Sequence, residues 1–144
     1  EVNVYDVLME VITLIKPKME QSAIQLVQKF EPCPQLITGN HNALKQVFLN
    51  LVLNAIQAMD GNGGQLTVKM SADHGNLVIE IIDTGVGIPQ EYMSKIFDPF
   101  FTTKKEGTGM GLALAYNIIN DHSGKINIDA TEGAGTTVKV ELPV

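Results

Sequence analysis

The chain of 144 residues contains no arginine and no tryptophan, and Cys33 is its single cysteine. A lone cysteine excludes a disulfide within the chain and is typical of a reducing compartment, so we expect a cytoplasmic location. No apolar run reaches the roughly 18 residues that a membrane-spanning helix needs. The N-terminus also lacks the basic and apolar pattern of an export signal.

The basic residues are few and of one kind. All ten are lysines, and sixteen acidic residues leave a net charge of −6. Proteins that bind DNA or RNA usually present a basic surface, so nucleic acid is not an expected partner. An anionic ligand can still bind an acidic protein where backbone N–H groups, a metal ion and one or two local cations form the site.

The length and the composition, 44% hydrophobic and 18% charged, are typical of one globular domain. Apolar residues recur at helical spacing over about 4–22, 41–59 and 111–122, and a short helix is expected at 90–96. Pro17 is expected to kink or divide the first helix, and Asn40 or Thr38 to cap the second. Strands are expected at 25–30, 36–38, 66–71, 77–83, 125–129 and 136–142. This order predicts a mixed, mostly antiparallel sheet with helices layered on one face.

Two asparagines lie one turn apart on the second long helix, outside its apolar stripe. These are Asn50 and Asn54, and residues four apart face the same side of a helix. Their amide oxygens could bind Mg²⁺, a cation that takes oxygen ligands and bridges phosphates. The alternative is a solvated helix face, because asparagine is usually exposed.

The next informative segment reads DTGVGIP, from Asp83 to Pro89. An apolar strand ends in a carboxylate, and Gly85 and Gly87 then allow close approach of a flat ligand to the backbone. An ionised carboxylate only accepts hydrogen bonds, so Asp83 suits an amino group such as N6 of adenine. The alternative is an Asx turn that closes the strand.

Three of the five phenylalanines lie in the segment 97–101, and Lys104 and Lys105 follow in a polar run. Buried rings can anchor a loop whose polar part closes over a site as a lid. The two lysines are candidate catalytic cations, because phosphoryl transfer needs positive charge near the γ-phosphate and the chain has no arginine. The alternative is that both are ordinary exposed loop lysines.

A glycine-rich segment, GTGMGL at 107–112, precedes the last helix. Gly109 and Gly111 would let phosphate oxygens approach the backbone, and a helix N-terminus attracts anions. This spacing differs from the dinucleotide-binding and P-loop patterns, and by itself it is a weak signal.

Taken in chain order, five segments resemble the nucleotide-binding boxes of the catalytic ATP-binding domain of sensor histidine kinases. That family belongs to a superfamily that includes gyrase, heat-shock protein 90 and mismatch-repair ATPases. The segments are QVFLNLVLNAIQAM (46–59), DTGVGIP (83–89), FDPFF (97–101), GTGMGL (107–112) and GAGT (133–136). The third and fourth are most similar to kinases of the nitrogen-regulation and sporulation type. The resemblance covers about 5–144 and implies a two-layer α/β sandwich of the Bergerat type.

The resemblance also implies roles for individual residues. Asn54, and secondarily Asn50, would hold Mg²⁺; Asp83 would read adenine; and Thr136 would support the water network at the base. ATP would lie between the helices and the lid. Further nucleotide contacts are implied for Gly85, Gly87, Ile88, Phe97, Thr108, Gly109, Met110, Gly111 and Leu112.

The implied function is transfer of the γ-phosphate of ATP to a histidine on a separate dimerisation domain, and from there to a response regulator. In the family the acceptor histidine is followed by an acidic residue and an Asn-Pro pair, and His41, His74 and His122 all lack that context. We therefore expect residues 1–144 to be one catalytic domain, with the acceptor and sensor domains elsewhere. The parent protein could be anchored in a membrane outside this segment.

One departure concerns ATP hydrolysis. Members of the superfamily that hydrolyse ATP have a glutamate one turn before the metal-binding asparagine, and here that position is Asn50. A neutral amide is too weakly basic to take a proton from water, so a gyrase-like or chaperone-like ATPase is disfavoured. A second alternative is an ATP-binding module or serine kinase that pairs with a protein, as anti-sigma factors of this superfamily do. The phenylalanine- and threonine-containing lid favours the sensor kinase.

Overall fold

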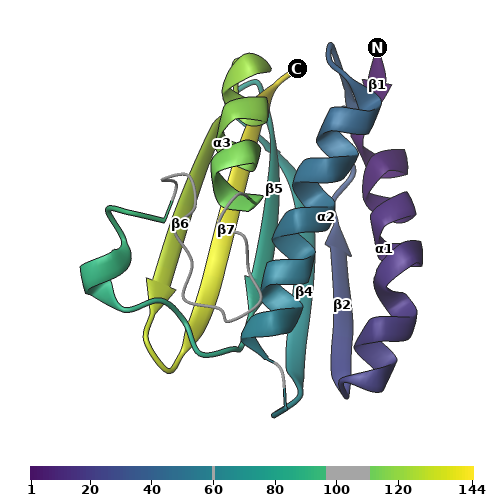
Figure 1. Cartoon of the computed structure of the whole chain (residues 1–144). Coiled ribbons are helices and arrows are strands. Elements are labelled where there is room, and N and C mark those ends of the chain that lie inside the picture. Colours follow the sequence, from purple (N-terminus) through teal and green to yellow (C-terminus); the bar gives the residue numbers. More distant parts are fainter. Residues whose placement is uncertain (60, 97–110) are drawn as a thin grey trace.

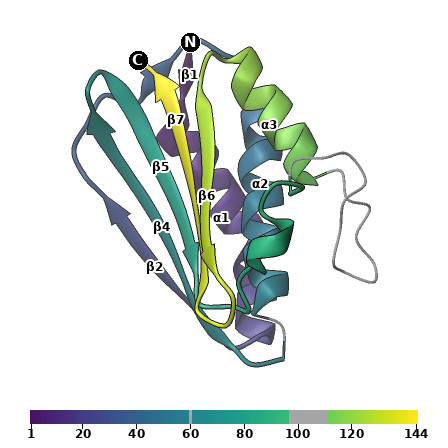
Figure 2. The ribbon, with the colours of Figure 1, turned by 90° about the vertical axis from the view of Figure 1, so that its left-hand side faces the viewer.

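The computed structural model describes residues 1–59, 61–96 and 111–144 (Figure 1). These residues form a five-stranded sheet with three α-helices on one of its faces, which Figure 2 shows from the side. The helices are α1 (Val4–Gln21), α2 (His41–Ala58) and α3 (Gly111–Asp121). Within the described residues, no helix has the combination of length and hydropathy that crossing a membrane requires.

The sheet has the strand order β2-β4-β5-β7-β6. The bounds are β2 Ile24–Phe30, β4 Gly64–Asp73, β5 Asn76–Asp83, β6 Lys125–Thr131 and β7 Gly135–Pro143. β2 and β4 are parallel, with α2 in the connection between them, and the other three pairs are antiparallel. The predicted mixed, mostly antiparallel sheet with helices on one face is confirmed.

Two short strands form a separate antiparallel pair. β1 (Val2–Asn3) pairs with β3 (Leu36–Ile37), and the backbone N–H of Val4 donates to the carbonyl of Gln35 at 2.9 Å. β3 follows β2 along the chain, yet it joins the N-terminus instead of the main sheet. This pairing ties the start of α1 to the segment that leads into α2.

α1 runs through Pro17 as one helix, so the predicted division there is wrong. Pro17 lies on the exposed side, where it removes one N–H that would otherwise bond to the carbonyl of Thr13. Ile15 and Met19, on either side of it in the chain, are 3% and 2% exposed. Their burial continues the apolar stripe past the proline, and this packing holds the helix together.

The short helix expected at 90–96 is smaller in the structure. A single 3₁₀ turn, η1 (Gln90–Tyr92), is followed by further turns up to Ile96. The N–H groups of Tyr92, Met93 and Lys95 donate to carbonyls three residues earlier, which is the 3₁₀ pattern.

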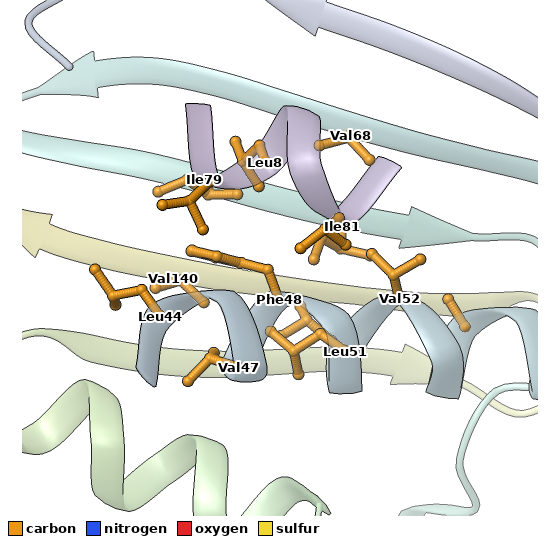
Figure 3. Close-up of a cluster of buried hydrophobic side chains, with 14 of the residues drawn as sticks. Leu8, Leu44, Val47, Phe48, Leu51, Val52, Val68, Ile79, Ile81 and Val140 are labelled. Atoms are coloured by element: carbon orange, nitrogen blue, oxygen red, sulfur yellow. The ribbon is translucent and has the colours of Figure 1, made fainter. Parts of the chain in front are cut away.

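The core lies between the sheet and the helices, and α2 is at its centre. Phe48 is fully buried and points from α2 toward the strands, among Ile79 and Ile81 of β5 and Val140 of β7 (Figure 3). α2 also packs between α1 and α3 (Figure 1). A residue on α2 is therefore held at a defined position relative to the ends of β5 and β7.

Candidate functional site

Asp83 is the last residue of β5 and is only 6% exposed. Among the described residues it is the one charged side chain that is buried. Its backbone is directly opposite Leu66 of β4 on one side and Thr136 of β7 on the other. Directly opposed residues project to the same face of a sheet, and Leu66 is buried in the core. The register thus brings Asp83 and Thr136 together beneath the helical layer.

The Asx turn considered as an alternative for Asp83 is present. The backbone N–H of Gly85 donates to Oδ1 of Asp83 at 2.8 Å. An Asx turn does not require a buried carboxylate, and burial of a charge is unfavourable without strong partners. A carboxylate has about four lone-pair sites, so accepting the N–H of Gly85 is compatible with accepting other hydrogen bonds. The turn and a ligand-binding role are therefore compatible.

The glycines that follow Asp83 are needed for close packing of the backbone. A Cβ on Gly85 would lie 2.5 Å from the carbonyl oxygen of Ala58, at the end of α2. Gly87 has φ of +72°, and a Cβ there would collide with the carbonyl oxygen of Thr131 at the end of β6. These two close contacts are a sufficient reason for glycine at both positions. The predicted approach of a flat base to the backbone would be a second reason.

Hydrogen bonds attach this loop to its neighbours on two sides. The N–H of Val86 donates to the carbonyl of Ala58 at 3.1 Å, and the carbonyl of Val86 accepts from the N–H of Gly133 at 2.7 Å. The loop after Asp83 is thus bound between the end of α2 and the turn that joins β6 to β7. Ile88 continues this loop and is half-buried.

Thr84 is a contributor to the site that the sequence analysis missed. Its Oγ1 accepts a hydrogen bond from the N–H of Gln65 at 3.0 Å and donates to Sδ of Met59 at 3.5 Å. Met59 is the C-cap of α2 and is 1% exposed. One hydroxyl therefore links the end of β5 to the start of β4 and to the end of α2. The only signal in the sequence was its place between Asp83 and Gly85.

Replacement of Thr84 by valine is expected to destabilise the chain by about 1 kcal/mol, because the N–H of Gln65 loses its acceptor. ADP affinity should fall about threefold as the link between Asp83 and α2 loosens, whereas Thr84→Ser should retain both properties. Urea unfolding and calorimetry on the two variants test this. Equal behaviour of the valine and serine variants would show that the hydroxyl has no such role.

Asn50 and Asn54 lie on α2, and both are half-buried. Val47 precedes them by three and seven residues, so all three share one side of the helix. Figure 3 shows Val47 on the side of α2 that faces α3. Asn54 is also one turn before Ala58, whose carbonyl binds the loop after Asp83. The structure thus places the asparagine row beside α3 and close to the Asp83 loop.

α3 begins at Gly111, and Leu112 is partly buried against the core. The other predicted residues of the lid and glycine loop lie outside the described residues, and their roles stay predictions. They are Phe97, Lys104, Lys105, Thr108, Gly109 and Met110.

The described ranges contain no group of three or more His, Cys, Asp or Glu side chains that could hold a metal ion. This excludes a preformed site of that kind in 1–59, 61–96 and 111–144. Mg²⁺ often needs few protein ligands, because it keeps several waters and is shared with the phosphates of a nucleotide. The amide oxygens of Asn50 and Asn54 are the donors in this region that fit such a shared site.

A family model described as histidine kinase-, DNA gyrase B-, and HSP90-like ATPase matches residues 39–144. The chain belongs to this family. It is similar to sporulation kinase A of Bacillus subtilis (strain 168), with 35% identity over 141 residues. That match covers 98% of the chain and 23% of the kinase, so the chain spans about a quarter of this relative's length.

Solved structures extend the similarity to the fold. The nucleotide-free catalytic domain of the histidine kinase ThkA has a TM-score of 0.87 and 33% identity, covering 99% of this chain and 93% of that one. ThkA in complex with the response regulator protein TrrA has a TM-score of 0.83 and 29% identity, covering 99% and 40%. Full-length ShkA in complex with AMPPNP has a TM-score of 0.86 and 25% identity, covering 99% and 30%. The chain has the fold of a histidine-kinase catalytic domain, as predicted.

Proposed function

We propose that this chain is the catalytic ATP-binding domain of a two-component sensor kinase. It binds ATP with Mg²⁺ and directs the γ-phosphate to a histidine on a separate dimerisation domain, for onward transfer to a response regulator. The observation that carries the proposal is the buried carboxylate of Asp83, with the half-buried Thr136 directly opposite it in the sheet. The similarity to sporulation kinase A, to ThkA with a response regulator and to ShkA with AMPPNP supports it.

The base-binding end of the site rests on Asp83. Its carboxylate accepts a hydrogen bond from the amino group of adenine, a group that guanine does not have at the same ring position. Thr136 lies opposite and contributes a hydroxyl that can both donate and accept. A guanine in this site would leave buried polar groups unpaired, and sites of that kind discriminate strongly between ligands.

The phosphate-binding end rests on α2 and α3. Asn54, with Asn50, provides amide oxygens for Mg²⁺, and the N-terminus of α3 provides positive electrostatic potential toward anions. Bound ATP supplies the phosphoryl group, and Mg²⁺ neutralises part of its charge. The protein residues hold these groups in place and orient them toward the acceptor.

Asn50 favours transfer of the γ-phosphate to a histidine over hydrolysis of ATP by water. Because its amide cannot act as a general base toward water, the site has no group at this position that would activate a water molecule. The chain's own histidines are engaged elsewhere: His41 contacts Glu10 and His74 contacts Asp73, each at 2.5 Å, and His122 bonds to Asn40 at 3.0 Å. In this proposal the acceptor histidine lies on another domain.

A labelling experiment tests the proposal. The chain is incubated with Mg²⁺ and ATP labelled at the γ-phosphate, alone and with a purified dimerisation domain such as that of sporulation kinase A. We expect label on the dimerisation domain and none on the chain by itself. The control is the same domain with its acceptor histidine replaced by glutamine, which should stay unlabelled. Stable label on the chain alone, or none on any acceptor domain tried, would contradict the proposal.

A further inference from the structure

His122, directly after the end of α3, connects this helix to the beginning of α2. Its Nε2 accepts a hydrogen bond from the backbone N–H of Asn40 at 3.0 Å, and its Nδ1 donates to the carbonyl of Ile118 at 2.7 Å. A backbone N–H only donates and a carbonyl only accepts. These two partners therefore require a neutral ring that carries its proton on Nδ1.

The neighbouring residues are arranged so that the ring can reach Asn40. A Cβ on Gly39 would collide with Cδ2 of His122 and would lie 2.7 Å from Nε2, so a larger residue at 39 would displace the ring. Asn40 is the N-cap of α2, and its side chain accepts a hydrogen bond from the N–H of Ala43 at 2.9 Å. The ring thus bonds to a residue whose position is itself determined by α2.

The contact joins the end of α3 to the beginning of α2. Figure 1 shows that the two helices are antiparallel neighbours, with the end of α3 at the same level as the beginning of α2. From His122 back to Gly111 is eleven residues, which is about 16 Å of helix. The same distance along α2 from Asn40 leads to about Leu51, between the two asparagines of the proposed Mg²⁺ site.

The bond of His122 adds a directional contact to the apolar packing of α3. Ala115 and Ile119 are fully buried in the core, but apolar contacts are non-directional. A hydrogen bond has a defined length and direction, so a bond at one end of α3 can determine the position of the other end.

We propose that His122 is a positioning residue: its bond to Asn40 holds the N-terminus of α3 level with Asn50 and Asn54, where the phosphates bind. This inference rests on the proposed nucleotide function, since it assigns the phosphates to that end of α3. The neutral ring of His122 with its proton on Nδ1 is expected with or without a bound nucleotide.

The ring can be observed directly. In a ¹⁵N–¹H correlation spectrum of the imidazole groups at pH 7.5, His122 should show the neutral form protonated on Nδ1. Neutral histidine protonated on Nε2, or a protonated imidazolium, would remove the acceptor for Asn40 and would overturn the inference.

Two variants test the effect on the nucleotide. His122→Leu removes the acceptor, whereas the amide oxygen of His122→Gln can still accept from the N–H of Asn40. We expect the leucine variant to bind ATP·Mg²⁺ about three- to tenfold more weakly than wild type, which is the range expected when a helix N-terminus loses its alignment with an anion. Adenosine, which has no phosphates, should bind all three proteins equally in an NMR titration. The glutamine variant should retain most of the affinity for ATP.

The outcomes separate the inference from the proposed function. Wild-type protein that binds neither ATP nor adenosine would contradict the proposed function, whatever the tautomer of His122. If wild type binds ATP, equal ATP affinities for the leucine and glutamine variants would overturn the inference alone. A leucine variant that loses affinity for ATP and adenosine by the same factor would overturn it as well, because His122 would then act only through overall stability.

Discussion

ADP is expected to bind about 10- to 100-fold more weakly when Asp83 is replaced by asparagine, because a hydrogen bond to a charged acceptor typically contributes about 1.5–3 kcal/mol. The asparagine Oδ1 can still accept the N–H of Gly85, so the Asx turn and the fold should survive. The other carboxylate oxygen, which is proposed to face the base, is replaced by an NH₂ group. This group donates hydrogen bonds and cannot accept one from the amino group of adenine. Calorimetry with ADP measures the loss, and circular dichroism checks the fold.

Asp73→Asn is the matched control for this variant. Asp73 ends β4 as Asp83 ends β5, but its side chain is 54% exposed and its ion-pair partner is His74. The same change of charge there should leave ADP affinity unaltered. Wild type should also prefer ADP over GDP, since Asp83 reads the amino group. GDP bound as tightly as ADP, or an Asp83→Asn variant with wild-type affinity, would remove Asp83 from the base-binding site.

The second large effect is expected from Asn54→Asp. A carboxylate can still bind Mg²⁺, but it adds a negative charge beside the phosphates, and like charges about 4 Å apart repel by about 4 kcal/mol at an effective dielectric constant near 20. Attraction to the metal offsets part of this cost. We expect phosphate transfer to an acceptor domain to slow by at least about tenfold while the protein stays folded.

The control for this second variant is Gln57→Glu, which adds a negative charge on an exposed position of α2. Transfer kinetics with the same acceptor domain should be close to wild type for this control. If both variants slow transfer equally, the effect comes from net charge, and Asn54 has no specific part in metal binding. If neither changes transfer or the affinity for ATP·Mg²⁺, the proposed metal site on α2 is wrong.

Local patterns were sufficient to predict most of the elements. The apolar spacing around Phe48 predicted α2 almost to its ends, and alternation predicted β4 and β5 as a hairpin. Strand order could not be predicted, because it depends on which strand edges meet after the chain collapses. The N-terminal pairing of β1 with β3 is of this kind, since two residues per strand carry almost no sequence signal.

The predicted division of the first helix at Pro17 was wrong for a related reason. Its intrinsic cost in a helix is about 3 kcal/mol, but the buried residues on both sides of it in α1 outweigh that cost. Helix propensity considers one residue at a time, whereas tertiary packing acts on the whole stripe.

Site residues whose chemistry is evident from their own segment could be predicted from the sequence. Residues that act through contacts with distant parts of the chain could not. Asp83 was identifiable as a carboxylate at the end of an apolar strand, and its register with Thr136 followed only from the sheet. The bonds of Thr84 to Met59 and of His122 to Asn40 join residues 25 and 82 positions apart. No local pattern in the sequence indicates such contacts, so neither bond could be predicted.

The most direct test of the account is a crystal structure of the chain with AMPPNP and Mg²⁺. It should show the amino group of adenine within hydrogen-bond distance of the carboxylate of Asp83, the phosphates at the N-terminus of α3, and Mg²⁺ bound by Asn54. An analogue bound with its base away from Asp83, or in another part of the molecule, would contradict the central claim that this end of the sheet is the nucleotide site.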